Sequence, residues 1–234
     1  MMTNLPWQNE KEFYDLHSKG IFSRFPFYHV SMIGKTKEEF LEYIIQKAKI
    51  NENSNVVDLG CGSGYVAASL NKICSCVGIS TSSECISQCL LNYPNDKYEI
   101  ANMENYQNSK VTHFLALESI GYSNISITLK NIFTNLSEGG IFYVKDLVRL
   151  YKESEKEEAN RKYWEKYWCY NSFSVPEIIR IAYSFNFKLL EFNDITSKIN
   201  SRMFRESLKY NKVEFTLPYP KVNFLLAAEF IFVK

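Results

Sequence analysis

The chain has 234 residues, of which 46% are hydrophobic and 15% aromatic, and its formal net charge is +1. That length suits one domain with a sizeable core, and the composition excludes an intrinsically disordered chain. Because Lys plus Arg (27) nearly equals Asp plus Glu (26), the charge provides no broad basic field for nucleic acid or an anionic membrane surface. We therefore expect a small-molecule partner, with no nucleic acid and no membrane.

The N-terminal stretch MMTNLPWQNEKEFYDLHSKG lacks the charged start and apolar core of a signal peptide. No later run approaches the roughly 18 uninterrupted apolar residues of a membrane span, so we expect a soluble cytoplasmic protein. The closest cysteine pair has one intervening residue, whereas zinc sites usually have two to four. We expect no metal, and interpret the cysteines as small, half-buried thiols: Cys61, Cys74, Cys76, Cys85, Cys89 and Cys169.

Helical signals come first along the chain, over 10–19 and 36–49, and the second opens with a capping-box spacing at Thr36 and Glu39. Strands and helices then alternate. The predicted strands are runs of β-forming residues bounded by turn residues: 56–59, 74–80, 98–102, 112–119 and 141–148. The helices between them are 65–72, 82–93 and 125–140, the last ending at a Gly-Gly pair. This order predicts a parallel sheet with helices on both faces.

The C-terminal third departs from that alternation. Its predicted elements are a polar helix 151–170, a helix 174–185, a strand 187–195, a helical stretch 197–210 and a closing strand 224–234. The sequence has no internal repeat, low-complexity linker or convincing boundary. We therefore expect a single domain over 1–234 that carries an insertion.

A glycine-rich turn follows the first predicted strand in VVDLGCGSGYVAASL. Its glycines are Gly60, Gly62 and Gly64, and Tyr65 stands where a dinucleotide fingerprint has its last glycine. No Gly-Lys-Ser/Thr follows, so a P-loop is also excluded. Asp58 just before the turn would repel a pyrophosphate and could accept a hydrogen bond from an ammonium group. The turn therefore predicts a ligand that is cationic at this point.

These residues resemble motif I of the class I S-adenosylmethionine-dependent methyltransferases, which favour Asp/Glu-x-Gly-x-Gly-x-Gly. Further segments are similar in the same order: VGIS, ANMENY, LALES and NLSEGGIFYVKD. The resemblance covers roughly 52–150. It implies a Rossmann-like α/β fold whose central, mostly parallel, seven-stranded sheet has helices on both faces and an antiparallel last strand. It implies S-adenosyl-L-methionine as cofactor and S-adenosyl-L-homocysteine as product.

The resemblance also implies which residues hold the cofactor: Asp58, Gly60, Cys61, Gly62, Gly64, Ser80, Thr81, Asn102, Met103, Glu104 and Tyr14. Two positions depart from the family pattern. Ser80 stands where many relatives have an acidic residue for the ribose hydroxyls, a replacement that also occurs in the branch with cyclopropane fatty acid synthases and tocopherol-type enzymes. Asn102 replaces the usual Asp near the adenine. It either bonds the adenine amino group or simply makes a turn.

Candidate catalytic residues are Glu118 and Tyr122, just beyond the fourth predicted strand, and His29 in the N-terminal segment. Glu118 could act as a base, orient a hydroxyl or stabilise positive charge on an alkene carbon. A cap or salt bridge is its structural alternative. His29 could equally be a satisfied structural histidine.

The resemblance divides the chain into an N-terminal helical cap (1–50), a cofactor-binding core (52–150), a substrate-lid insertion (150–176) and a C-terminal part of the sheet (177–234). The lid holds an aromatic cluster that would cover an apolar or planar acceptor, although such spacing is most often core. Its members are Tyr163, Trp164, Tyr167, Trp168 and Tyr170.

The sequence favours a small, partly apolar methyl acceptor. The charge is balanced, and ESIGY stands where enzymes acting on base amines carry Asn/Asp-Pro-Pro-aromatic. Whether oxygen, nitrogen or carbon receives the methyl stays open, and a homodimer is compatible with the sequence. Two alternatives remain: a non-catalytic S-adenosylmethionine-binding module, and cyclopropane-type lipid modification.

Overall fold

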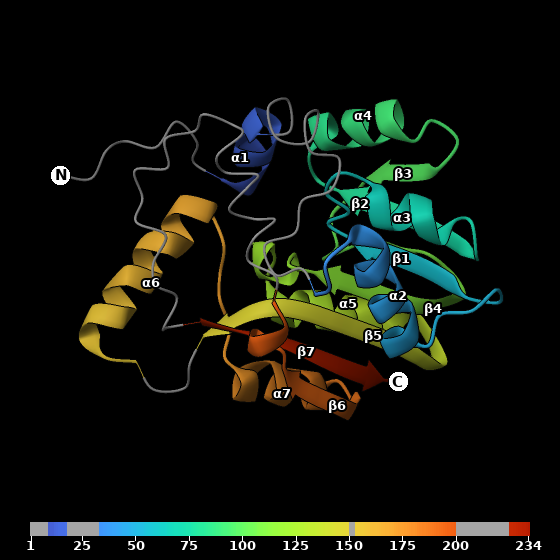
Figure 1. Cartoon of the computed structure of the whole chain (residues 1–234). Helices are drawn as coiled ribbons and strands as arrows, with labels where there is room; N and C mark the ends of the chain where they lie inside the picture. Colours follow the sequence, from blue (N-terminus) through green and yellow to red (C-terminus); the bar gives the residue numbers. More distant parts are fainter. Residues whose placement is uncertain (1–8, 18–32, 150–152, 200–224) are drawn as a thin grey trace.

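The computed structural model describes residues 9–17, 33–149, 153–199 and 225–234 (Figure 1). Within these ranges seven strands form one sheet in the order β3-β2-β1-β4-β5-β7-β6. The strands are β1 (Asn55–Leu59), β2 (Ser75–Ser80), β3 (Lys97–Ile100), β4 (Val111–Leu117), β5 (Leu136–Arg149), β6 (Lys188–Asp194) and β7 (Leu225–Val233). Each corresponds to a predicted strand.

Strand direction follows the predicted pattern. The pairs β1–β2, β1–β4, β2–β3 and β4–β5 are parallel, whereas β7 runs antiparallel to both β5 and β6. The prediction of a mostly parallel sheet with an antiparallel last strand is therefore confirmed. Because the carboxyl ends of parallel strands meet at one edge, the loops after β1, β2, β4 and β5 are brought together there.

Helices cover both faces of the sheet (Figure 1). They are α1 (Glu10–His17), α2 (Lys37–Ala48), α3 (Tyr65–Leu70), α4 (Ser83–Asn92), α5 (Ile125–Asn135), α6 (Glu155–Trp168) and α7 (Val175–Ser184), with short 3-10 turns η2 (Ile120–Tyr122) and η3 (Thr196–Lys198). Helices α2 and α3 contribute to the core on one face, and α5 and α7 to the core on the other. In the described residues no helix is long and apolar enough to cross a membrane.

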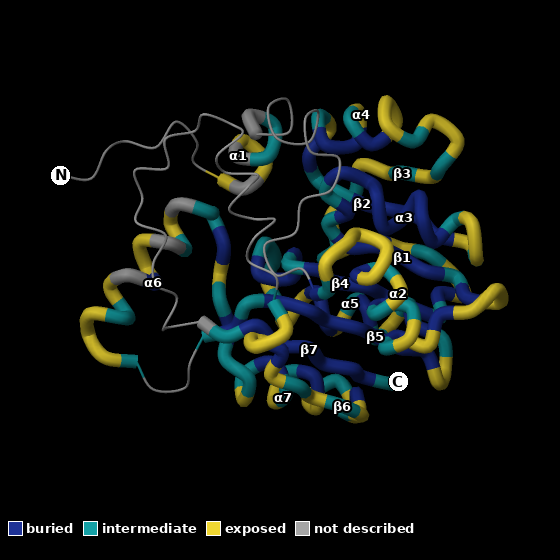
Figure 2. Tube along the Cα trace, viewed as in Figure 1, coloured by how far each residue is buried: buried dark blue, intermediate teal, exposed yellow. Residues whose placement is uncertain are grey.

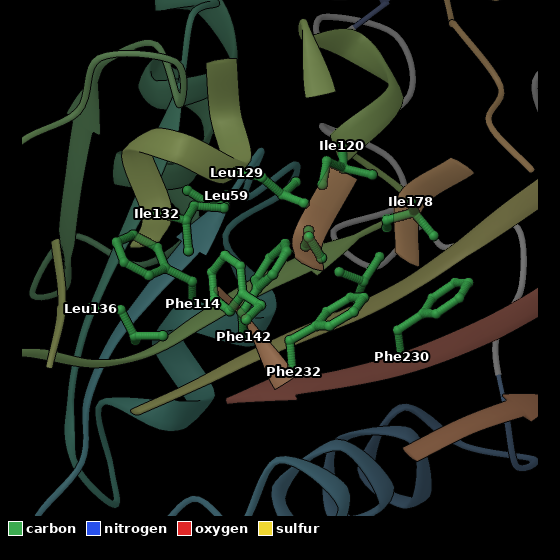
Figure 3. Packing of buried hydrophobic residues seen from close by; sticks show 14 of the residues in the cluster. Leu59, Phe114, Ile120, Leu129, Ile132, Leu136, Phe142, Ile178, Phe230 and Phe232 are labelled. Carbon is green, nitrogen blue, oxygen red and sulfur yellow. The ribbon is translucent and has the colours of Figure 1, made fainter. Parts of the chain in front are cut away.

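The larger core lies between the sheet and α5 and α7 (Figure 3). The rings of Phe142, Phe230 and Phe232, from β5 and β7, lie in its centre and are fully buried. Figure 2 shows the same result along the chain, with the central strands buried and the outer turns exposed. Burial of this many large apolar side chains is the main stabilising contribution to the fold.

Local sequence signals explain where most helices begin. The Thr36 hydroxyl accepts a hydrogen bond from the Glu39 backbone N–H at 3.2 Å, as its predicted capping-box spacing suggested. Helix α2, which begins after Thr36, buries Phe40, Ile44 and Ala48 on one face. Ser154 and Glu157 form a reciprocal capping box at the start of α6. In Figure 1, α6 stands to one side of the sheet.

Two predicted helices differ in extent from those observed. The helix expected over 125–140 ends at Asn135, because Leu136 already pairs with Val111 of β4. The two glycines lie in β5 and do not cap a helix: the Gly139 N–H donates to the Lys234 carbonyl at 3.2 Å. Of the helical stretch expected over 197–210, only the turn η3 is described, and the remainder lies outside the described residues.

Candidate functional site

The glycine turn leaves β1 at the carboxyl edge of the sheet. Gly60, Gly62 and Gly64 all have positive φ, at 71°, 52° and 83°, a region that side chains disfavour. The backbone N–H groups of Gly60 and Cys61 both donate to the Ile79 carbonyl, at 2.9 and 3.0 Å. The turn is thereby fixed to the neighbouring strand β2.

The turn also approaches the segment after β4 closely. A Cβ atom at Gly60 would lie 2.7 Å from the Ser119 Cβ, and one at Gly64 would lie 2.8 Å from the Tyr98 hydroxyl. Neither position can hold a side chain without displacing its neighbour. Ser119 is 3% exposed, and its hydroxyl has no hydrogen-bond partner among the described residues. It adds an unsatisfied polar group next to the turn.

Asp58 lies in β1 between Gly78 of β2 and Leu115 of β4 and is 2% exposed. Burial raises the pKa of its carboxyl group to about 7. The structure records no hydrogen bond to this carboxylate from the described residues. A buried carboxylate without a donor is costly unless a ligand satisfies it, and a cationic donor suits it best.

The side chain of Cys61 points into the protein, where it packs with Ile86 and Cys89. The thiols of Cys85 and Cys89 donate to the Gly62 carbonyl at 2.8 and 3.1 Å. The backbone of Cys61 is also bonded within the chain, its N–H to the Ile79 carbonyl and its carbonyl from the Gly64 N–H at 2.9 Å. A cofactor contact at Cys61 stays a prediction. The hydrogen bonds from the Cys85 and Cys89 thiols stabilise the conformation of the turn at Gly62.

Ser80 and Thr81 are partly buried at the end of β2, where the resemblance places a ribose. The Ser80 hydroxyl accepts from the Ser82 N–H at 3.2 Å, and the Ser82 hydroxyl donates to the Asp15 carboxylate at 2.6 Å. Sequence reasoning missed this contact of α1 with the start of α4. It brings a carboxylate within two residues of Ser80, the position where the acidic residue is lacking.

The third strand is followed by Asn102, Met103 and Glu104. The Asn102 side-chain oxygen accepts from the Glu104 N–H at 2.8 Å, and Glu104 accepts from the Asn124 N–H at 2.7 Å. Asn102 therefore forms the turn that the sequence also allowed. The Met103 methyl carbon would lie 3.9 Å from a Cβ at Gly60, so this segment borders the glycine turn. The ligand contacts of the three residues stay predictions.

Glu118, directly after β4, has a φ of 59°, which is strained for a residue with a side chain. Its N–H donates to the Lys145 carbonyl at 2.8 Å. Its carboxylate lies 2.7 Å from the Lys145 ammonium, whose side chain is fully buried and lies over the Phe40 ring. The structure thus shows the salt bridge that was the alternative for Glu118. Its role as a base stays a prediction.

Three tyrosines from three elements meet beyond β4. The ring centroids of Tyr14 and Tyr122 are 5.2 Å apart, and those of Tyr122 and Tyr170 are 4.8 Å apart, both edge to face. Burial raises the pKa of all three phenols above the ordinary value. The hydroxyls therefore stay protonated near neutral pH. His29 lies outside the described residues.

Asp146 of β5 faces this tyrosine cluster. It is 1% exposed, and the Tyr170 hydroxyl donates a short hydrogen bond to its Oδ1. Its Oδ2 has no hydrogen-bond partner within residues 9–17, 33–149, 153–199 and 225–234. Burial, opposed in part by the bond from Tyr170, raises the pKa of Asp146 to about 7. Within the described part of the chain, no three His, Cys, Asp or Glu residues gather as a metal site would need.

Residues 32–191 match the sequence model of the protein family described as "Methyltransferase domain", which is more than half of the chain. The chain belongs to this methyltransferase family. The resemblance drawn from the glycine turn, to class I S-adenosylmethionine-dependent methyltransferases, is confirmed.

A curated relative of the methyltransferase is a probable cobalt-precorrin-6B C(15)-methyltransferase (decarboxylating) of Methanococcus vannielii, 32% identical over 81 residues. The match covers 34% of this chain and 44% of that protein, so the chain accounts for less than half of its relative's length.

Solved structures of similar fold include the cyclase SpnF, with a TM-score of 0.77 at 13% identity, covering 100% of this chain and 99% of that one. Another is the geranyl diphosphate C-methyltransferase of Streptomyces coelicolor, whose complex contains S-adenosyl-L-homocysteine, with a TM-score of 0.75 at 13% identity and 99% coverage of both chains. These likenesses confirm the class I fold. At such low identity they do not identify a reaction.

Sequence reasoning missed two charged residues of the candidate site, Lys145 and Asp146. Their signal was present, since both lie inside the apolar strand YVKDLV and charged residues are rarely buried without a role. Sequence reasoning assigned Tyr170 only to the lid. Its bond to Asp146 spans 24 residues, and no local pattern announces such a contact.

Proposed function

We propose that the protein transfers a methyl group from S-adenosylmethionine to a small, partly apolar molecule. One observation carries this proposal. The buried carboxylate of Asp58 receives no hydrogen bond from the described residues and lies beside three glycines with positive φ. An adenosyl amino acid brings an ammonium group that satisfies such a carboxylate. Its methionine part needs the close backbone approach that glycines permit.

The rest of the cofactor follows from the order of the strands. With the methionine part at Asp58 and the glycine turn, the ribose lies at the end of β2, near Ser80 and Thr81. The adenine then lies near Met103. Asp15 is bonded to Ser82, two residues after Ser80, and would supply the acidic contact that Ser80 does not. The binding roles predicted for these residues rest on this placement.

The acceptor would lie on the other side of the donor methyl, beyond β4 and β5. The Tyr14, Tyr122 and Tyr170 rings provide the apolar surface there, and Glu118 and Asp146 the charge. Methyl transfer from a sulfonium is an in-line displacement, so the protein's main task is to hold donor and acceptor close and away from water. A small acceptor with an apolar part fits such a lining.

Two measurements test this function. Isothermal titration with S-adenosylmethionine and S-adenosylhomocysteine should show saturable binding of both. Incubation of the protein and methyl-labelled cofactor with a metabolite extract should transfer the label to a small molecule. Absence of binding at millimolar ligand would contradict both the donor assignment and the motif assignment.

A protein that binds the cofactor without transferring its methyl group is the second candidate. It is favoured by the likeness to the cyclase SpnF, a protein of the same fold named for a different reaction. Saturable cofactor binding combined with no labelled product in any extract fraction would support it over methyl transfer.

A further inference from the structure

The carboxylate of Asp146 is only half satisfied. Its Oδ1 accepts from the Tyr170 hydroxyl and from the Leu147 N–H at 2.7 Å, while its Oδ2 is buried and has no partner in the part of the chain that the structure describes. Buried polar atoms are nearly always hydrogen-bonded. An orphaned carboxylate oxygen inside a ligand site therefore indicates a hydrogen-bond donor that arrives with the ligand.

Asp146 differs in this respect from Glu118. Both belong to the same group of charges, since each raises the pKa of Tyr14. The Glu118 carboxylate is held by the buried Lys145 ammonium at 2.7 Å, however, whereas Lys145 and Asp146 are successive residues of a strand and their side chains leave it on opposite faces. Of the two carboxylates, Asp146 has the oxygen available to accept a proton.

We propose that Asp146 is the base of the reaction and that the acceptor presents an O–H or N–H group to its Oδ2; this inference rests on the proposed methyl transfer. In the step, the acceptor oxygen or nitrogen attacks the donor methyl and the sulfur–carbon bond breaks, with its electron pair going to sulfur. The acceptor proton passes to Asp146 Oδ2 and later to water. The products are the methylated acceptor and neutral S-adenosylhomocysteine.

The hydrogen-bonding argument separates acceptor classes. A hydroxyl or amine satisfies Oδ2 on binding, whereas an alkene carbon would leave the buried oxygen unpaired, which disfavours it. Because Oδ2 is buried, binding has to displace a covering side chain. Tyr14, on the short helix α1, is one of the groups that face it.

The environment also tunes Asp146 for proton transfer. The titratable and charged groups near it are Tyr14 from α1, Tyr122 from η2, Tyr170 from the segment after α6, Glu118 and, from the other face of the strand, Lys145. Burial, the largest cause, raises its pKa to about 7, and the Tyr170 bond lowers it in part. A base with a pKa near the working pH transfers protons most effectively.

Tyr170 acts on this site as a positioning residue. A side chain at Gly121 would overlap its ring, and the Asn171 N–H donates to the Gly121 carbonyl at 2.8 Å. These contacts hold the segment after α6 against η2. They aim the Tyr170 hydroxyl at Oδ1 and leave Oδ2 directed toward the acceptor.

The test measures cofactor binding by titration, and label transfer with metabolite extract at saturating S-adenosylmethionine, where titration of Asp58 no longer contributes. We expect Asp146→Asn to retain cofactor affinity and to lower turnover at least about a hundredfold. In the wild type, turnover should rise with pH through about 7. Asp146→Asn should lose this rise, and the exposed-carboxylate control Glu42→Gln should keep it.

Tyr170→Phe separates positioning from a purely structural role. Removing the hydroxyl takes away a bond that lowers the pKa of Asp146, so the rise in turnover should move to higher pH while cofactor binding stays unchanged. A merely structural tyrosine would change stability without moving the pH profile.

The outcomes are distinguishable. Equal turnover of wild type and Asp146→Asn, or a labelled product methylated on carbon, would overturn this inference and leave the methyltransferase proposal intact. Failure of the wild type to bind cofactor or to label any product would overturn the proposed function and this inference with it. Label on oxygen or nitrogen, lost in Asp146→Asn, supports both.

Discussion

Two buried carboxylates of the same sheet have opposite surroundings. Asp58, at the carboxyl edge of β1, receives no donor from the described residues. Glu229, on β7, is 0% exposed and accepts from the hydroxyls of Tyr43 and Tyr143, both at 2.8 Å. It also accepts from the Asn193 amide at 2.7 Å, and the Lys47 ammonium lies at 3.5 Å.

The difference separates a structural role from a binding role. Around Glu229 the chain supplies every partner itself, so the network joins α2 to strands β5, β6 and β7 without any ligand. At Asp58, as at Asp146 Oδ2 and Ser119, the described residues leave a buried polar group without a hydrogen-bond partner. Burial without partners lowers stability, and such groups are expected where a ligand completes the site.

The largest effect is expected from Glu229→Ala. The substitution leaves the donors of Tyr43, Tyr143 and Lys47 without their common acceptor, and should lower the free energy of unfolding by about 3 to 5 kcal/mol. Urea denaturation measures it, with Glu42→Ala on the exposed side of α2 as control. A loss below about 1 kcal/mol would mean that Glu229 does not organise the network.

Asp58→Asn should act on binding and spare the fold. Loss of a buried charge-assisted hydrogen bond of about 1.5 to 3 kcal/mol corresponds to a roughly 10- to 100-fold weaker affinity for S-adenosylmethionine. Isothermal titration measures the affinity, and thermal unfolding of the same variant checks the fold. Unchanged affinity would count against the placement of the donor at the glycine turn.

The two buried carboxylates of Asp58 and Asp146 should also make the free energy of unfolding depend on pH. Both Asp58 and Asp146 have a pKa raised from 3.8 to about 7, so between these values the folded chain keeps protons that the unfolded chain releases. Their contribution to the free energy of unfolding therefore declines as pH rises from about 4 to 7.

The double variant Asp58→Asn/Asp146→Asn removes both titrations. It should exceed the wild type in stability by about 1 to 3 kcal/mol at pH 8, and the difference should shrink toward pH 4. Denaturation of the two proteins across this pH range measures the difference. A difference that is independent of pH would contradict the raised pKa values.

The smallest effect is expected from Tyr43→Phe. It removes one of several donors to Glu229 and leaves the Tyr143, Asn193 and Lys47 contacts in place. The free energy of unfolding should fall by about 0.5 to 1.5 kcal/mol. A loss as large as that of Glu229→Ala would show that the network depends on this one bond.

Periodicity and turn chemistry in the sequence were enough to predict every strand in order and the glycine turn. They failed at Leu136, because its pairing with Val111 overrides the helical pattern that continues past Asn135. In the candidate site, Glu118 was found from its position after a strand. Its partner Lys145 was overlooked, although a lysine inside the apolar strand YVKDLV is a local signal. The contact of Asp15 with Ser82 was missed because it depends on how distant elements pack and leaves no local signal.

Strand β5 continues past Lys145, its last residue that pairs with β4, and is paired there with β7, from Asp146↔Ala228 to Arg149↔Leu225. Because side chains alternate along a strand, its register decides which charge reaches which face. A slip by one residue would send the Asp146 carboxylate toward α2 and the Lys145 ammonium into the acceptor region. The chain would then keep its binding site for the methyl donor. It would present the Lys145 cation to the methyl acceptor, where it now presents the Asp146 carboxylate.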